Sequence, residues 1–171
     1  MNHKNTWKKV LSTDEKIEFE FSISDRYIKF SLIVWVAVIG LLILFSPIMF
    51  SVSFLALYLS FLGILILVVG IIIFLIVLFY FGFYLKVANA YALTNKRVLI
   101  HRGWLSTNLV SIDYSKITDV SIYEPFFGKI ITHSGYIAIN TAGTQLQEVI
   151  LKNIKTPYEI KKKLDLLKSK H

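Results

Sequence analysis

The strongest pattern along the chain is one apolar run from Phe30 to Leu85, which holds no Asp, Glu, Lys, Arg or His. Crossing the ~30 Å hydrocarbon core of a bilayer takes ~20 residues of helix, so the run is too long for one span and suits two. Ser46-Pro47 interrupts the run, because proline lacks the N–H that a continuous helix needs. The pattern therefore predicts a two-helix transmembrane hairpin at 28–85, with spans at about 28–45 and 57–81 and a turn at 46–53.

Before this run, residues 17–23 alternate apolar and polar side chains with a period of two, which indicates a half-buried strand. Such a strand needs a sheet to join, and the other β-type segments lie beyond residue 86. We therefore expect the N-terminal segment 1–27 to carry a strand that pairs with, or packs on, a C-terminal domain. Residues 1–10 are expected to fray. Because mostly polar residues precede the apolar run, no cleavable signal peptide is expected.

From Lys86 onward, the sequence consists of short β-type runs separated by turn residues. About six strands at this spacing predict an antiparallel barrel or sandwich. The segment Glu124–Lys129 is expected to connect two strands through a helical turn that buries Phe126 and Phe127. The fold class is therefore a membrane α-hairpin followed, at 86–171, by a mainly-β barrel with a C-terminal helix.

The start of that closing helix is marked in the sequence. Thr156 is a suitable cap, Pro157 suits the first helical position, and Glu159 completes a capping box. Leu164 belongs to an apolar stripe at helical spacing, so we expect it to face the barrel interior.

The net charge of +8 is unevenly placed, since residues 1–29 carry +1 and residues 86–171 carry +7. Basic residues near span ends mark the cytoplasmic side of a membrane, which predicts that both termini are cytoplasmic and only the turn is outside. Ion and proton pathways usually need ionisable groups within the spans. Their absence from the apolar run argues against a channel or pump acting alone.

Five pieces of the β-type region follow one another in order: Tyr91-Ala92-Leu93-Thr94-Asn95-Lys96-Arg97-Val98-Leu99-Ile100 with Arg102-Gly103-Trp104-Leu105-Ser106, then 112–120, Phe127-Gly128, 135–143, and the helix after Thr156-Pro157. In this order they resemble the bacterial pleckstrin-homology-like domain family. Together with the hairpin, the chain is similar to the small YdbS-type two-span membrane proteins. The resemblance implies a seven-stranded, strongly bent sheet capped by the C-terminal helix. It supports a prediction of the fold more firmly than a prediction of activity.

No residues suggest catalysis or a cofactor. The chain has no cysteine, its four histidines share no helical face and have no acidic cluster nearby, and its serines lack a nucleophile-elbow context. We therefore expect no enzyme activity, no metal site and no cofactor. The basic residues Lys96, Arg97 and Arg102, with Trp104, lie in and just beyond the first hairpin of the domain. Three readings stay open for them: a polar turn, non-specific contact with anionic lipid headgroups, and stereospecific headgroup recognition.

The sequence favours a membrane-anchored, non-enzymatic interaction or scaffold module at the inner face of the cell membrane. Two alternatives stay open, an accessory subunit of a transport or export system and a sensor of anionic lipid. The expected partners are the lipid bilayer and a protein, with another membrane protein of the same family as one candidate. Nucleic acid is not expected, because topology beside an anionic leaflet explains the positive charge better.

Overall fold

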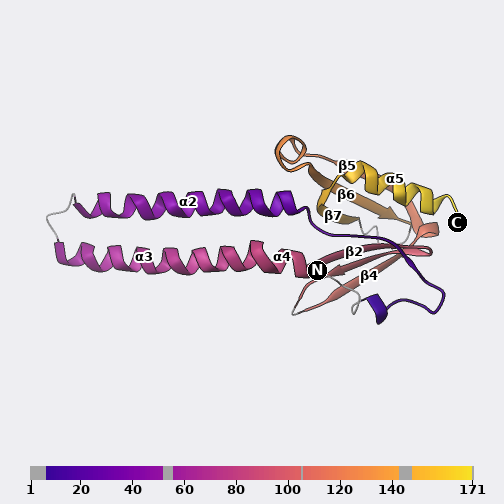
Figure 1. Cartoon of the computed structure of the whole chain (residues 1–171), viewed down its shortest axis with the longest axis horizontal. Coiled ribbons are helices and arrows are strands. Elements are labelled where there is room, and N and C mark those ends of the chain that lie inside the picture. Colours follow the sequence, from indigo (N-terminus) through magenta and orange to yellow (C-terminus); the bar gives the residue numbers. More distant parts are fainter. Residues whose placement is uncertain (1–6, 52–55, 105, 143–147, 171) are drawn as a thin grey trace. The chain divides into compact units, whose positions relative to one another are not determined.

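The computed structural model describes residues 7–51, 56–104, 106–142 and 148–170 (Figure 1). These residues form two compact units, each described here by itself. One unit is the helical hairpin, Ile28–Tyr84. The other is a β-rich domain that combines Met1–Tyr27 with Leu85–His171, so the hairpin is inserted between two segments of this domain.

The hairpin consists of α2 (Asp25–Ser51) and α3 (Ala56–Phe79), and α3 continues into a π-helical turn, η1 (Tyr80–Tyr84), and a short helix, α4 (Leu85–Ala88). Here the prediction needs correction, because α2 passes through Pro47 and ends four residues later. A proline removes one N–H from the helical ladder, a loss that apolar helices tolerate. Of the turn predicted at 46–53, residues 52 and 53 lie outside the described residues.

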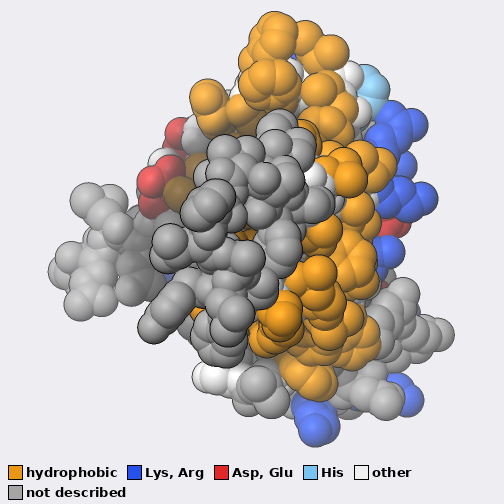
Figure 2. All heavy atoms as spheres, turned by 90° about the vertical axis from the view of Figure 1, so that its left-hand side faces the viewer, with side chains coloured by type: hydrophobic (Ala, Val, Ile, Leu, Met, Phe, Trp, Pro, Cys, Tyr) orange, Lys and Arg blue, Asp and Glu red, His pale blue; other side chains and the backbone are white. Residues whose placement is uncertain are grey.

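Large apolar side chains of the two helices point outward instead of filling a core. Leu44 is 72% exposed and Ile64 is 63% exposed. Hydrophobic side chains cover much of the face that Figure 2 displays. The described part of this unit therefore leaves unburied the surface that a water-soluble protein would hide.

The β-rich domain has two antiparallel sheets. Four strands form the first in the order β1-β2-β3-β4, and three form the second in the order β5-β6-β7. Their bounds are β1 Ile17–Phe21, β2 Asn89–Thr94, β3 Arg97–Arg102, β4 Asn108–Asp113, β5 Ile117–Tyr123, β6 Ser134–Thr141 and β7 Val149–Lys155. A closed barrel was predicted, but among the described residues the two sheets do not close. The chain bends between them at a 3-10 turn, η2 (Tyr114–Lys116), and at the other side they meet through one bridge, Ile23 to Ile154.

The seventh strand of the domain comes from the N-terminal segment. Strand β1 pairs antiparallel with β2, and Phe21 lies opposite Tyr91. The two apolar side chains also touch, with ring centroids 5.5 Å apart. Residues before β1 are packed as well, since the Trp7 side chain is buried among Ala90, Ala92 and Leu99. For residues 7–10, the expectation of a frayed terminus was therefore wrong.

The main core lies between the two sheets and the C-terminal helix α5 (Pro157–Lys168). Leu164 is 1% exposed there, as its place on the apolar stripe predicted. The helix begins where expected, but the capping box does not form. Thr156 adopts a left-handed conformation (φ 45°), and its hydroxyl donates to the Glu159 carboxylate at 3.2 Å instead of accepting from a backbone N–H.

A further correction concerns the β5–β6 connection, which contains a π-helical turn, η3 (Gly128–Thr132). The sequence predicted a turn that buries two phenylalanines. The turn exists, but Phe126 and Phe127 are 71% and 66% exposed. The buried members are instead Gly128 and Thr132, because the turn packs through its backbone and its small side chains.

The packing of α5 generates a stability prediction. Replacing Leu164 with Ala removes a buried side chain and leaves a cavity, which is expected to lower the free energy of unfolding by about 2–5 kcal/mol. Leu166→Ala is a matched control on the same helix, because Leu166 is 56% exposed. Chemical denaturation of the full chain in detergent micelles measures both. Equal losses for the two variants would contradict the assigned orientation of α5.

Candidate functional site

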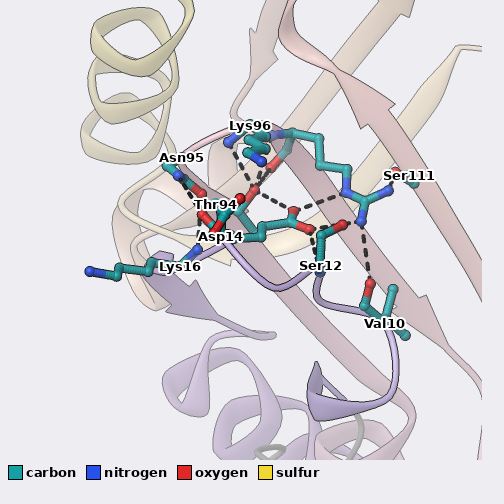
Figure 3. Close-up of polar contacts among 10 residues, drawn as sticks. Val10, Ser12, Asp14, Lys16, Thr94, Asn95, Lys96 and Ser111 are labelled. Atoms are coloured by element: carbon teal, nitrogen blue, oxygen red, sulfur yellow. Dashed lines mark hydrogen bonds and ion pairs between the residues drawn. The ribbon is translucent and has the colours of Figure 1, made fainter.

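The turn between β2 and β3 is bound to the N-terminal segment rather than left open (Figure 3). The Asn95 backbone N–H donates to the Lys16 carbonyl at 3.1 Å, and the Lys16 N–H donates to the Asn95 side-chain oxygen at 2.9 Å. The Asn95 side chain in turn donates to the Asp14 carbonyl at 3.2 Å. Asn95 therefore serves as a docking point for the segment that leads into β1.

Arg97 extends this docking through a buried ion pair. Its Nη2 and Nε atoms lie 2.7 Å and 2.9 Å from the two carboxylate oxygens of Glu15, a bidentate arrangement. Glu15 is 6% exposed and also accepts from the Thr94 hydroxyl at 2.8 Å. The remaining guanidinium N–H groups donate to the Val10 carbonyl and the Ser111 hydroxyl, at 3.3 Å and 3.2 Å. Arg97 thus holds the N-terminal segment on the sheet.

The hydrogen bonds from Arg97 lower the pKa of Glu15 to about 2, although burial opposes this shift. A carboxyl whose pKa is lower in the folded state stabilises the fold at pH values above its unfolded pKa. That stabilisation is lost as the pH falls toward the folded pKa.

The four residues predicted to contact lipid do not form one group. Lys96 is exposed in the β2–β3 turn beside the paired Arg97. Arg102 and Trp104 lie at the other end of this hairpin, where Asn89 pairs with Arg102. Six residues of strand separate the two ends, about 20 Å at the usual rise. Lipid contact by these residues stays a prediction.

Arg102 bridges the two sheets. It lies at the end of β3, and its Nη2 donates to the carbonyl of Ile150 in β7. The guanidinium also lies beside Tyr91, where it opposes the rise in the pKa of this phenol that burial causes. Trp104, two residues further on, is 44% exposed. Of the four predicted residues, Lys96 and Trp104 thus have the most accessible side chains.

A second feature, which the sequence did not reveal, is a cleft of about 670 Å³ in the β-rich domain. One wall is β1 with the residues that follow it, and the other is the end of β7 with the start of α5. Lys163 of α5 lies over the Phe19 ring of β1, with its Nζ 3.3 Å from the ring centroid. The lining residues are Phe19, Glu20, Phe21, Ser22, Ile23, Ser24, Asp25, Lys86, Ile154, Lys155, Thr156, Glu159 and Ile160.

Polar and charged residues line this cleft. Lys86 and Asp25 form an ion pair at 2.7 Å, and both side chains keep substantial exposure. Ser24 is only 2% exposed, and its hydroxyl has no hydrogen-bond partner within the described residues. A buried hydroxyl without a partner costs free energy. No sequence signal marked this cleft, because its lining residues come from three separate segments of the chain.

The strand edges beside the cleft suit the binding of an extended segment. Among the described residues, no group of three or more His, Cys, Asp or Glu side chains could hold a metal ion. The cleft also lies between strand edges, because β1 and β7 are the outer strands of their sheets. Exposed strand edges can bind extended segments of other proteins through backbone hydrogen bonds.

Comparison with known proteins gives a family match. The model of the bacterial PH domain family matches residues 27–168. Among solved structures, the chain is similar to the crystal structure of a DUF1696 family protein with a pleckstrin-homology domain from Shewanella loihica PV-4, at 17% identity and a TM-score of 0.37. That similarity covers 50% of this chain and 76% of the other. No curated protein matches the chain.

The Glu15–Arg97 pair generates a prediction about pH. From the lowered pKa of Glu15, the carboxylate is expected to contribute about 3 kcal/mol to stability above pH ~5 and progressively less toward pH ~2. Glu15→Gln removes this contribution, so the difference in unfolding free energy between the natural chain and the variant should shrink as the pH falls. Denaturation of the full chain in detergent at several pH values measures it. Lys96→Ala, beside Arg97, is the control and should change stability little; a pH-independent effect of Glu15→Gln would contradict the assignment.

Proposed function

Because the chain belongs to the bacterial PH domain family, we propose that it is a membrane-anchored, non-enzymatic interaction module. Its two apolar helices cross the bilayer and hold the PH-like domain at the inner face of the cell membrane. The cleft beside β1 is the surface that binds a segment of a partner protein. The family supports an interaction role, since PH-like domains are generally not catalytic.

One observation carries the membrane part of this proposal, namely the combination of apolarity and exposure in the two helices. The segments Asp25–Leu44 and Gly63–Ala88 have mean hydropathies of 2.4 and 3.4. Only 11% and 6% of their most apolar windows are buried. The core helix of a soluble protein would be mostly buried, so these helices lack the covering that such a protein needs. A bilayer supplies it.

The inner-face orientation is supported by the basic residues at the helix ends. Arg26 and Lys29 stand at the start of α2, and Lys86 follows α3 and η1. The 46–53 segment has no charged residue. The excess of Lys and Arg therefore belongs to the side that holds both the N-terminal segment and the PH-like domain.

The topology prediction follows directly. Reporter domains fused after residue 171 and within the 46–53 segment should occupy opposite compartments, with the C-terminal fusion in the cytoplasm. Washing membranes at alkaline pH should leave the full chain in the pellet, because the spans are integral. Release into the supernatant would contradict membrane insertion, whereas an external C-terminus would contradict only the orientation.

The binding role generates a separate prediction for the cleft. Glu159→Arg reverses the charge of a residue that lines it, and co-purification of the partner in mild detergent should fall at least several-fold. Asp165→Arg is the matched control, because Asp165 is an exposed acid on the same helix but does not line the cleft. Equal losses for both variants would place the partner elsewhere. A multi-span partner bound in fixed ratio would favour a transport subunit, and bound anionic lipid without protein would favour a lipid sensor.

A further inference from the structure

The β5–β6 connection presents large apolar side chains that the described residues of the domain leave exposed. We define the β5–β6 loop as residues Glu124–His133. Four of its side chains, Phe126, Phe127, Ile130 and Ile131, are 42% to 71% exposed. Scattered apolar side chains on a surface are ordinary, but a cluster of four within six residues marks a contact site.

This exposure is built into the loop by its own hydrogen bonds. The Lys129 N–H donates to the Pro125 carbonyl at 2.8 Å, and the buried Thr132 hydroxyl lies 2.6 Å from the Ser134 hydroxyl. A Cβ atom at Gly128 would come within 2.5 Å of the Ser134 carbonyl oxygen, so the backbone here is tightly folded. The loop thus holds its large side chains outward while its small residues pack inward.

The loop lies near the residues at which the chain leaves the domain and returns to it. The backbone carbonyl of its last residue, His133, accepts a hydrogen bond from the Thr156 N–H at 3.2 Å. Thr156 lines the same cleft as Asp25 and Lys86. At the base of the loop, Tyr136 stacks on Tyr123 with centroids 6.0 Å apart. The loop therefore lies at the end of the domain where the chain leaves into the first apolar helix and returns from the second (Figure 1).

A second loop lies at this same end. The Gly103 N–H donates to the Ala88 carbonyl at 2.7 Å, which puts the exposed Trp104 close to the end of α4. Tryptophan favours the interfacial region of a bilayer. Two separate loops thus present aromatic side chains at the end of the domain where both helices connect.

We infer that the β5–β6 loop inserts its apolar tip into the interfacial region of the bilayer, and so gives the domain a contact with lipid besides the two spans. This inference rests on the proposed function. The chemistry of the loop fits a lipid surface: aromatic and aliphatic side chains point outward, Lys129 adds a positive charge, and the loop's single acid, Glu124, stands at its first position. Peripheral membrane segments combine these two features, with apolar side chains entering the headgroup boundary and cations attracted to anionic lipid.

The chain has no cysteine, so single cysteines carrying a polarity-sensitive fluorophore report on individual positions. The full chain is reconstituted in vesicles of phosphatidylcholine and phosphatidylglycerol containing nitroxide-labelled lipids. Three variants are compared: Phe127→Cys in the loop, Leu166→Cys on α5 as the matched exposed control, and Ile72→Cys as the span reference. Leu166 is exposed but lies nine residues along α5 from its start, about 13 Å.

If the loop inserts, the label at position 127 should lose about half of its fluorescence to nitroxides near the headgroups, and the label at 166 should lose little. The label at 72 should be quenched by nitroxides deep in the acyl chains. Quenching at 72 without quenching at 127 overturns the inference and leaves the proposed function standing. Quenching at 127 alone supports loop insertion but contradicts the spans.

Two further outcomes would count against insertion of the loop. A blue-shifted emission at 127 that lipid nitroxides do not quench would mean that another protein surface covers the loop, such as a second copy of this chain. Equal quenching at 127 and 166 would mean a general approach of the domain to the membrane without insertion of the loop. Either result overturns the inference.

Discussion

The pairing of β1 with β2 is the interaction on which the rest of the structure depends. These strands precede and follow the apolar hairpin, so their ladder joins chain segments separated by the whole hairpin. Closing so long a connection costs conformational entropy, although the cost grows only slowly with length. Two helices that already lie side by side in a bilayer would bring these segments close and reduce that cost. Domain folding and hairpin formation therefore support each other under the proposed function, and residues 86–171 without β1 would expose the β2 edge to solvent.

The positive charge of the chain serves more than one purpose. Arg97 neutralises a buried carboxylate and Arg102 bridges the sheets, so these two cations stabilise the domain from within. Charge reversal at such residues would lower stability whatever the ligand. Lys96 and the lysines on α5 remain accessible, and their charges act mainly through long-range attraction, which salt screens. Counting basic residues in the sequence therefore overstates the number that could bind a headgroup.

Composition and periodicity predicted the hairpin, the strand before it and the closing helix, because each of these depends on local pattern. Leu164 could be placed in the core from helical spacing alone. The Glu15–Arg97 pair could not be predicted, since its members are 82 residues apart and only the fold brings them together. The cleft could not be predicted for the same reason, since its lining residues lie far apart in the sequence. Phe126 and Phe127 were misjudged because a general preference for burying aromatic residues does not reveal a loop that packs through Gly128 and Thr132.

Two ion pairs of the domain differ in how much they contribute to its stability. The Glu15 carboxylate is buried, so breaking its pair with Arg97 would leave an uncompensated charge, a loss of several kcal/mol. Asp25 and Lys86 are both well exposed, and a pair of this kind contributes at most about 1 kcal/mol. The Asp25–Lys86 pair itself therefore adds little to the stability of the domain. Because these residues also stand where the chain enters and leaves the hairpin, a partner bound in the cleft would contact the domain at the point of its attachment to the two apolar helices.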